Sequence, residues 1–303
     1  MNALLSKKGL SIERLHALCK VGEHGGITAA FPDNESEQSR ISTSLRALST
    51  YFGVELTERK GKRIALTRAG DELARLCREH FRALEDFDLR CHNEPPVIAI
   101  GSGDSLLQWL VLQRLEKIRV ALDNPRIEIS NLRTENIVKR ITNLSLDFGL
   151  IRNIDVPKQC ASAVIGKYSY SIWMPKTLAP PTDPTRLNKF LETLSFAVVK
   201  TQWGTVFDDL AWKSAKIKIR VAVLCDSFPQ ALQTLTAGNY AAVLPSIANP
   251  FIDETQFVPV QPEFLKAIKD EVCLAWNPRF TDVRTCGEKA VQILSKNLKF
   301  PSS

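Results

Sequence analysis

Residues 25–70 constrain the fold of this chain more than any other stretch. They read GGITAAFPDNESEQSRISTSLRALSTYFGVELTERKGKRIALTRAG. Ile27, Ala29 and Ala30 predict a short helix with small side chains that another helix can cross closely, and Pro32-Asp33-Asn34 breaks it. A second helix, a basic turn and a third helix start follow. This order is typical of a helix-turn-helix module that docks in a DNA groove.

The second helix of this module has two chemically different faces. Apolar residues recur at intervals of three and four, which predicts a stripe that faces a core: Ile41, Leu45, Leu48 and Phe52. The opposite face carries short or hydrogen-bonding side chains, which allow close approach to base edges. We therefore predict DNA contacts for Arg40, Thr43 and Arg46 on this face.

A basic turn follows the second helix. Between residues 56 and 66, four cations surround Gly61: Arg59, Lys60, Lys62 and Arg63. Taken alone, the run is also compatible with a solvated charged loop. Directly behind a helix-turn-helix, it predicts a two-stranded wing that contacts sugar-phosphate.

The third helix is predicted to begin after Thr67, an expected N-cap, and to run to about Cys91. Apolar residues spaced by threes and fours form a seam on it, which comprises Leu73, Cys77, Phe81, Leu84 and Phe87. Such a seam on a charged helix predicts pairing with a second copy of the chain. The alternative is packing against the helix's own domain.

The pattern changes after Pro95-Pro96, where short apolar segments begin to alternate with helical ones. The expected strands are residues 97–101, 127–132, 146–152, 195–200, 217–224, 241–244 and 271–276. The expected helices are residues 105–122, 135–144, 228–237 and 285–298, and residues 179–186 are expected to form a loop. This alternation predicts an α/β region with a parallel sheet and crossover helices.

Two strand-to-helix turns in this region are candidate ligand sites. Ser102, Gly103, Asp104 and Ser105 follow the first strand and open a helix, where free backbone N–H groups favour an anionic ligand. Asp104 opposes an anion, so an amine-bearing or neutral ligand stays open, as does a capped turn without any ligand. Asp226-Ser227 opens another helix in the same way.

The residues of the N-terminal module resemble a known family. Spaced anchors over residues 10–92 look like the winged helix-turn-helix of LysR-type transcriptional regulators: Ile27-Thr28, Gln38-Ser39, Ile41-Ser42, Leu45, Leu48, Phe52-Gly53-Val54, Leu56, Arg59 and Leu66-Thr67-x-Ala69-Gly70. The resemblance implies that Gln38, Ser39 and Ser42 lie at the DNA-facing start of the recognition helix, with Arg59 near the wing. Thr43 and Ser49 depart from the family's usual basic residue and Glu, which bears on affinity and operator choice.

The resemblance extends more loosely to residues 124–150 and implies a periplasmic-binding-protein-like effector domain of two α/β subdomains. The expected parts are a winged helix-turn-helix at 1–66, a dimerisation helix at 67–92 and an effector domain at 97–303. Subdomain I would comprise 97–164 and 269–303, and subdomain II 165–268. A small molecule would bind between them, with Thr201 and Gln202 facing the cleft.

Composition limits the alternatives. The net charge of +7 fits an anionic partner without naming one. Seven dispersed cysteines and four histidines before residue 93 show no metal-ligand spacing, so we predict no metal or cofactor. No apolar run is long enough to span a membrane.

These observations predict a cytoplasmic, non-enzymatic regulator that binds double-stranded DNA and a small-molecule effector as a homodimer or homotetramer. Two alternatives stay open. The C-terminal region could be a solute-binding or enzymatic α/β protein, although nucleophile-elbow and P-loop motifs are absent from the sequence. The cysteines could instead form a redox switch.

Overall fold

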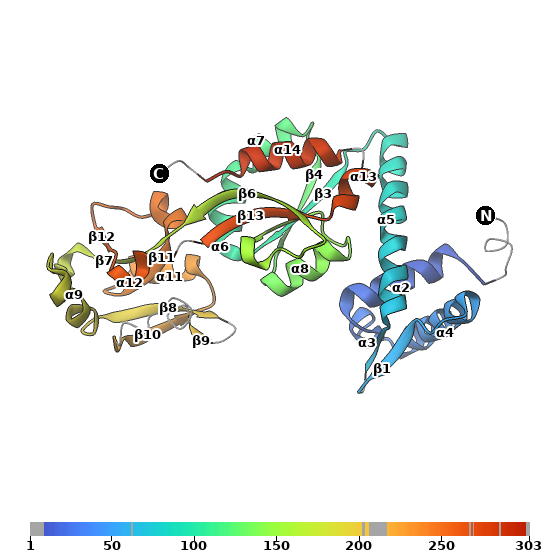
Figure 1. Ribbon diagram of the computed structural model, residues 1–303, viewed down its shortest axis with the longest axis horizontal. Coiled ribbons are helices and arrows are strands. Elements are labelled where there is room, and N and C mark those ends of the chain that lie inside the picture. The colour runs from blue at the N-terminus through green and yellow to red at the C-terminus, as the bar shows by residue number, and fades with distance from the viewer. Residues whose placement is uncertain are drawn as a thin grey trace.

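The computed structural model of the chain describes residues 9–61, 63–201, 204–205, 217–266, 268, 270–284 and 286–300. Figure 1 shows the N-terminal helices and hairpin at one end, the long helix α5 beside them, and two sheets that follow in a row. The predicted Lys62 and Gln202 contacts lie outside the described residues.

The N-terminal module has the predicted order of elements. These are α2 (Ile12–His24), α3 (Ile27–Ala30), α4 (Glu35–Phe52), β1 (Thr57–Lys60), β2 (Arg63–Leu66) and α5 (Arg68–Cys91). Asn34 begins α4 by accepting a hydrogen bond from the Glu37 amide, and Gly53 ends it at a φ of 71°. Thr67 caps α5 as predicted, because its Oγ1 accepts from the Gly70 amide at 3.1 Å.

The first effector sheet has five strands in the order β4-β3-β5-β13-β6. The strands are β3 (Val97–Ser102), β4 (Arg126–Asn131), β5 (Phe148–Arg152), β6 (Ala161–Tyr168) and β13 (Asp270–Trp276). Its helices are α6 (Asp104–Leu106), α7 (Leu115–Ala121), α8 (Thr134–Thr142), α13 (Pro278–Val283) and α14 (Gly287–Asn297). β13 returns from the second sheet and pairs antiparallel with both β5 and β6.

The second sheet has the order β10-β8-β11-β7-β12, with β9 paired to β8. Its strands are β7 (Tyr170–Pro175), β8 (Ser195–Thr201), β9 (Gly204–Thr205), β10 (Arg220–Cys225), β11 (Ala241–Pro245) and β12 (Phe257–Val260). The helices are α9 (Pro184–Leu191), α11 (Phe228–Ala237) and α12 (Glu263–Lys266). β8 is parallel to β10 and β11, whereas β7 is antiparallel to β11 and β12.

Several expectations need correction. The predicted parallel arrangement is confirmed for β3, β4 and β5. The sheets are mixed rather than wholly parallel, because β13 and β7 run antiparallel to their neighbours. Residues 179–186 are not all loop, since α9 begins at Pro184, a residue whose fixed φ suits the first turn of a helix. β6 stays in the first sheet to Tyr168, so the chain leaves that sheet later than residue 164.

The expected helix over residues 105–122 is also divided. A π-helical turn (Leu107–Val111) and a 3-10 turn (Leu112–Arg114) separate α6 from α7. A π-helical turn takes an extra residue, and such turns are frequent at functional sites.

The buried side chains form two large groups. One lies in the N-terminal module between α2, α4, the wing and the first half of α5. The other is continuous across both effector sheets. Within the described residues, no helix is both long and apolar enough to cross a membrane.

Candidate nucleic-acid interface and effector cleft

Helix α4 presents the two faces predicted from its sequence. Ile41, Leu45 and Leu48 are buried in the core of the N-terminal module. The predicted DNA-binding residues lie on the rest of the helix: Ser39, Arg40, Thr43 and Arg46 are exposed or nearly so, and Gln38 and Ser42 are half-buried. The outward face is therefore free to approach a groove.

Three of these side chains have partners within the chain, and one of them is local to the helix: the Thr43 hydroxyl donates to the Ser39 carbonyl oxygen at 3.1 Å. The Gln38 Nε2 donates to the Phe31 carbonyl oxygen at 2.8 Å, which fixes the turn between α3 and α4. Arg40 forms an exposed ion pair with Glu37 at 3.3 Å. Because exposed pairs contribute little to stability, Arg40 can exchange Glu37 for a phosphate at small cost.

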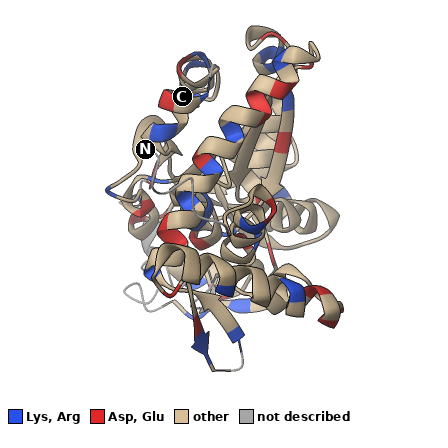
Figure 2. Ribbon diagram, turned by 90° about the vertical axis from the view of Figure 1, so that its right-hand side faces the viewer, with Lys and Arg blue, Asp and Glu red and all other residues tan. Residues whose placement is uncertain are grey.

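The basic run forms the predicted hairpin. β1 and β2 pair antiparallel, with Lys60 opposite Arg63 and Gly61 between them at a φ of 65°. Figure 2 shows this hairpin projecting below the helices, with basic residues near its end. Arg59, Lys60 and Arg63 are exposed. Glu58 lies 2.9 Å from the Lys60 Nζ and raises the pKa of Lys60, so the wing carries one compensated cation.

Local contacts hold the wing against the start of α5. The Thr67 amide donates to the Leu56 carbonyl oxygen at 3.0 Å, and its hydroxyl donates to the Glu55 carbonyl oxygen at 2.8 Å. Gly70 lies directly over the same Leu56 carbonyl, where a Cβ would overlap the oxygen. The hairpin is thus fixed in position relative to α4 by backbone contacts.

The predicted seam on α5 divides into two parts. Cys77 is buried in the core of the N-terminal module, and Leu73 and Phe81 pack against it. These three residues pack within their own domain, which is the alternative to the predicted pairing with a second copy. Leu84 and Phe87 are 56% and 58% exposed and are available to a second copy.

Charged side chains join α5 to the first effector sheet. Arg284 lies at the end of α13 and is 5% exposed. Its Nε donates to Asp86 of α5 at 2.6 Å, and its Nη2 donates to the Val97 carbonyl oxygen at 2.7 Å. Asp147 lies 3.5 Å from Nη1 and accepts from the Ala99 amide at 2.8 Å. Burial raises the pKa of Asp147, and this effect is larger than the opposite effect of the nearby arginines, which lower the pKa.

The predicted effector residues of the first sheet are only partly accessible. Ser102 is fully buried, and its hydroxyl donates to the Leu150 carbonyl oxygen at 3.3 Å. The proposed ligand contact through Ser102 is therefore wrong, because the hydroxyl bridges β3 and β5. Asp104 and Ser105 are half-buried, Gly103 is exposed, and Asp104 accepts from the Gln108 side chain at 3.0 Å.

The predicted residues of the second sheet lie at the start of α11. Asp226 pairs with Lys200 at 3.2 Å, and Ser227 caps α11 by accepting from the Gln230 amide. Thr201 ends β8. Helix α11 contacts α6, so the structure brings the two predicted turns to the same junction between the sheets.

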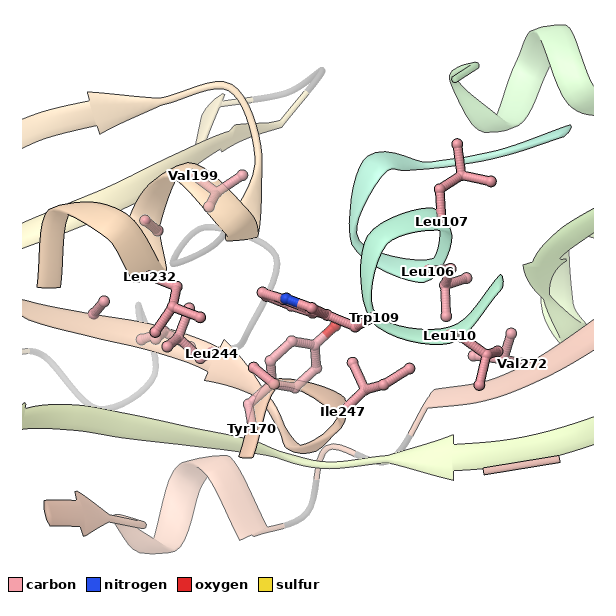
Figure 3. Close-up of a cluster of buried hydrophobic side chains, with 14 of the residues drawn as sticks. Leu106, Leu107, Trp109, Leu110, Tyr170, Val199, Leu232, Leu244, Ile247 and Val272 are labelled. Carbon is pink, nitrogen blue, oxygen red and sulfur yellow. The ribbon is translucent and has the colours of Figure 1, made fainter. Parts of the chain in front are cut away.

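The junction itself is filled by apolar side chains. Trp109 lies on the π-helical turn and stacks on Phe251, which follows β11 in the half of the effector region that contains the second sheet. The ring centroids are 6.2 Å apart. Figure 3 shows the Trp109 indole lying between Leu106 and Leu110 on one side and Leu232 and Leu244 on the other. The contact between the two halves is therefore apolar around Trp109.

Two protein-family models match parts of this chain. Residues 12–71 match "Bacterial regulatory helix-turn-helix protein, lysR family", and residues 93–284 match "LysR substrate binding domain". The chain belongs to the LysR family of transcriptional regulators.

Relatives of this LysR-type regulator are distant in sequence. The probable HTH-type transcriptional regulator LrrA of Synechococcus elongatus is 22% identical over 258 residues, which cover 84% of each chain. The uncharacterized HTH-type transcriptional regulator YfiE of Escherichia coli is 24% identical over 148 residues, 48% of this chain and 50% of YfiE.

Solved structures share the fold. A full-length OxyR variant from Pseudomonas aeruginosa has a TM-score of 0.65 at 14% identity, covering 98% of this chain and 97% of OxyR. CbnR has a TM-score of 0.56 at 14% identity, covering 96% of this chain and 100% of CbnR. LysG from Corynebacterium glutamicum, with bound effector Arg, has a TM-score of 0.59 at 14% identity, covering 96% of this chain and 100% of LysG.

Sequence reasoning did not find Trp109 or Arg284 in this regulator. One signal was present for Trp109: the run Leu106-Leu107-Gln108-Trp109-Leu110-Val111-Leu112 is apolar on nearly all sides, which predicts burial between two layers. Arg284 gave no local signal, because its partners lie far away in the sequence.

Proposed function

We propose that this LysR-type regulator binds double-stranded DNA through α4 and the β1–β2 wing. The observation that carries the proposal is the exposed polar face of α4 beside a hairpin with Arg59 and Arg63 at its tip. A helix of this kind suits the major groove, and cations on the adjoining ribbon suit the phosphates.

We further propose that the parts act in the predicted order: residues 1–66 bind DNA, residues 67–92 pair two chains, and residues 97–303 respond to a small molecule. With the boundary moved to the end of β6, subdomain I would comprise 97–168 and 269–303, and subdomain II 169–268. The chain would act in the cytoplasm as a homodimer or homotetramer, without catalytic activity. Exposed Leu84 and Phe87 support pairing through α5, and the contact of α6 with α11 supports a ligand site between the sheets.

The DNA-binding proposal is tested with the full-length protein and a labelled fragment of its own promoter region. The logarithm of the association constant should fall linearly with the logarithm of the salt concentration, because lysine and arginine side chains of the protein displace counterions from the phosphates. The double variant R59A/R63A should reduce the slope by about 2, because each lost phosphate contact removes roughly 0.9.

The matched control is R186A/K189A on α9, which removes the same charge far from α4 and should leave the slope unchanged. The wing would not be the phosphate contact if R59A/R63A kept the slope of the unmodified protein. The same conclusion would follow if the control variant reduced the slope by as much. No binding of the unmodified protein at low salt would reject the function itself.

A further inference from the structure

Thr43 lies at the centre of the outward face of helix α4. Because an α-helix turns by about 100° per residue, Thr43 lies about 160° around the axis from both Ile41 and Leu45. Ile41 and Leu45 are buried in the core of the N-terminal module, whereas Thr43 is exposed. Among the predicted contacts on α4, Thr43 is therefore the one most nearly opposite the buried stripe.

Cationic side chains flank Thr43 on both sides. Arg40 and Arg46 lie three residues before and after it, about 60° to either side around the helix axis. Both are exposed. Long cationic side chains at these angles can reach the phosphates along a groove, while the short side chain between them faces the base edges. The position of Thr43 is thus that of a base contact.

The Thr43 hydroxyl is already engaged within α4. Its Oγ1 donates to the carbonyl oxygen of Ser39, one turn earlier, at 3.1 Å. A hydroxyl has a single hydrogen to donate, so while this bond holds Thr43 has none for an acceptor on a base. The bond also draws Oγ1 toward the helix backbone. Because the Cβ is branched, the methyl group points away from this carbonyl and is left for contact with DNA.

The bases differ in what they offer to a methyl group in the major groove. Thymine presents its C5-methyl group there, and apolar side-chain atoms pack against it. Cytosine presents an amino donor at the same edge, and adenine and guanine present polar atoms. A polar edge that loses water against a methyl group without gaining a hydrogen bond is disfavoured. The Thr43 methyl group therefore favours thymine.

We propose that the Thr43 methyl group reads the C5-methyl group of a thymine in the DNA site of this regulator. The inference rests on the proposed function, because it requires that α4 lie in the major groove. It also gives a chemical meaning to the departure from the family's usual basic residue at this position. An apolar contact with one base takes the place of a cation.

The test uses DNA fragments that the full-length protein selects from a random-sequence library. Affinity is measured by fluorescence anisotropy for a selected fragment and for the same fragment with uracil in place of every thymine, which removes only the C5-methyl groups. The unmodified protein should bind the uracil fragment more weakly, by about 4-fold for each Thr43 contact, as expected for one buried methyl group.

Two substitutions of Thr43 separate its methyl group from its hydroxyl. T43S keeps the hydroxyl and removes the methyl group, so its loss of affinity on uracil should be smaller than that of the unmodified protein by about 4-fold per contact. T43V keeps a methyl group and removes the hydroxyl, so it should show the full loss.

The matched control is T50S, which also removes a methyl group from an exposed threonine of α4. The Thr50 hydroxyl donates to the Arg46 carbonyl oxygen at 3.1 Å, as the Thr43 hydroxyl does to Ser39. Thr50 lies two turns further from the N-terminal end of the helix, which is the end that contacts base edges in helix-turn-helix proteins. T50S should therefore lose as much affinity on uracil as the unmodified protein.

Equal losses on uracil in T43S and the unmodified protein would overturn the proposal, because the methyl contact would not exist. A T43V variant that no longer distinguishes uracil from thymine would overturn it as well, since the hydroxyl would then be the group that reads the base. Binding with either pattern leaves the proposed function standing. If the unmodified protein selects and binds no DNA, the function itself is rejected, and this proposal with it.

Discussion

At the scale of single residues, the burial of Asp147 gives a measurable pH effect. Burial raises the pKa of its carboxyl above the ordinary value of 3.8 despite the nearby Arg82 and Arg284. Between the unfolded and folded pKa values the folded state holds more protons, so stability falls as pH rises through that window.

The variant D147N lacks this dependence. The free energy of unfolding of D147N should equal that of the unmodified protein at about pH 4. The difference should grow in favour of D147N as pH rises, by up to roughly 1.4 kcal/mol per pH unit within the window. Urea unfolding from pH 4 to 7.5 measures it, with the exposed Asp282→Asn as control. A relative stability that falls with pH would show that the arginines outweigh burial.

Gly70 is a second residue whose surroundings decide the outcome of a substitution. A Cβ there would overlap the Leu56 carbonyl oxygen, which is backbone and cannot move aside alone. We expect G70A to cost on the order of 1–3 kcal/mol, as for an overpacked core, and to weaken promoter binding by displacing the wing. G103A, where nothing lies within 4 Å of the new Cβ, is the control. Thermal unfolding and anisotropy check both effects.

At the scale of elements, α5 has one face in the core of the N-terminal module and another exposed. Leu84 and Phe87 lie on the exposed face, beyond the part that packs on α2. Adding charge there should oppose apolar pairing. We expect L84E/F87E to sediment as a smaller species than the unmodified protein at equal concentration.

The matched control for this experiment is L112E/V120E, which adds the same charges at exposed apolar positions of the effector part. If the sedimenting mass of L84E/F87E were unchanged, or if the control lost as much mass, the pairing surface would lie elsewhere on the chain.

Elements with a strong local pattern could be predicted from the sequence, and contacts between distant elements could not. The stripe of Ile41, Leu45 and Leu48 predicted the buried face of α4, and Gly61 predicted the hairpin turn. By contrast, Arg284 and Asp86 are 198 positions apart. Ser102 looked like a ligand contact because it ends a strand, but its carbonyl partner, Leu150, becomes a neighbour only when the sheet forms.

At the scale of the whole molecule, the two large apolar cores are separate and α5 connects them through polar contacts. Arg284 joins Asp86 to the first sheet, and Arg78 of α5 donates to the Asn143 carbonyl oxygen at 2.6 Å. Breaking a buried ion pair by removing one partner costs about 3–5 kcal/mol, because it leaves an uncompensated charge. Cooperative unfolding of the two parts should therefore depend on Arg284.

The sequence offers two separate probes of that cooperativity. All five tryptophans lie at or after residue 109, so their fluorescence reports the effector part, whereas far-UV circular dichroism also reports α2, α4 and α5. In the unmodified protein the two urea transitions should coincide. In R284M they should separate, since the N-terminal module no longer shares the stability of the sheets, and the control R220M, exposed on β10, should keep them together. Coincident transitions in R284M would mean that Arg284 is not what couples the two cores.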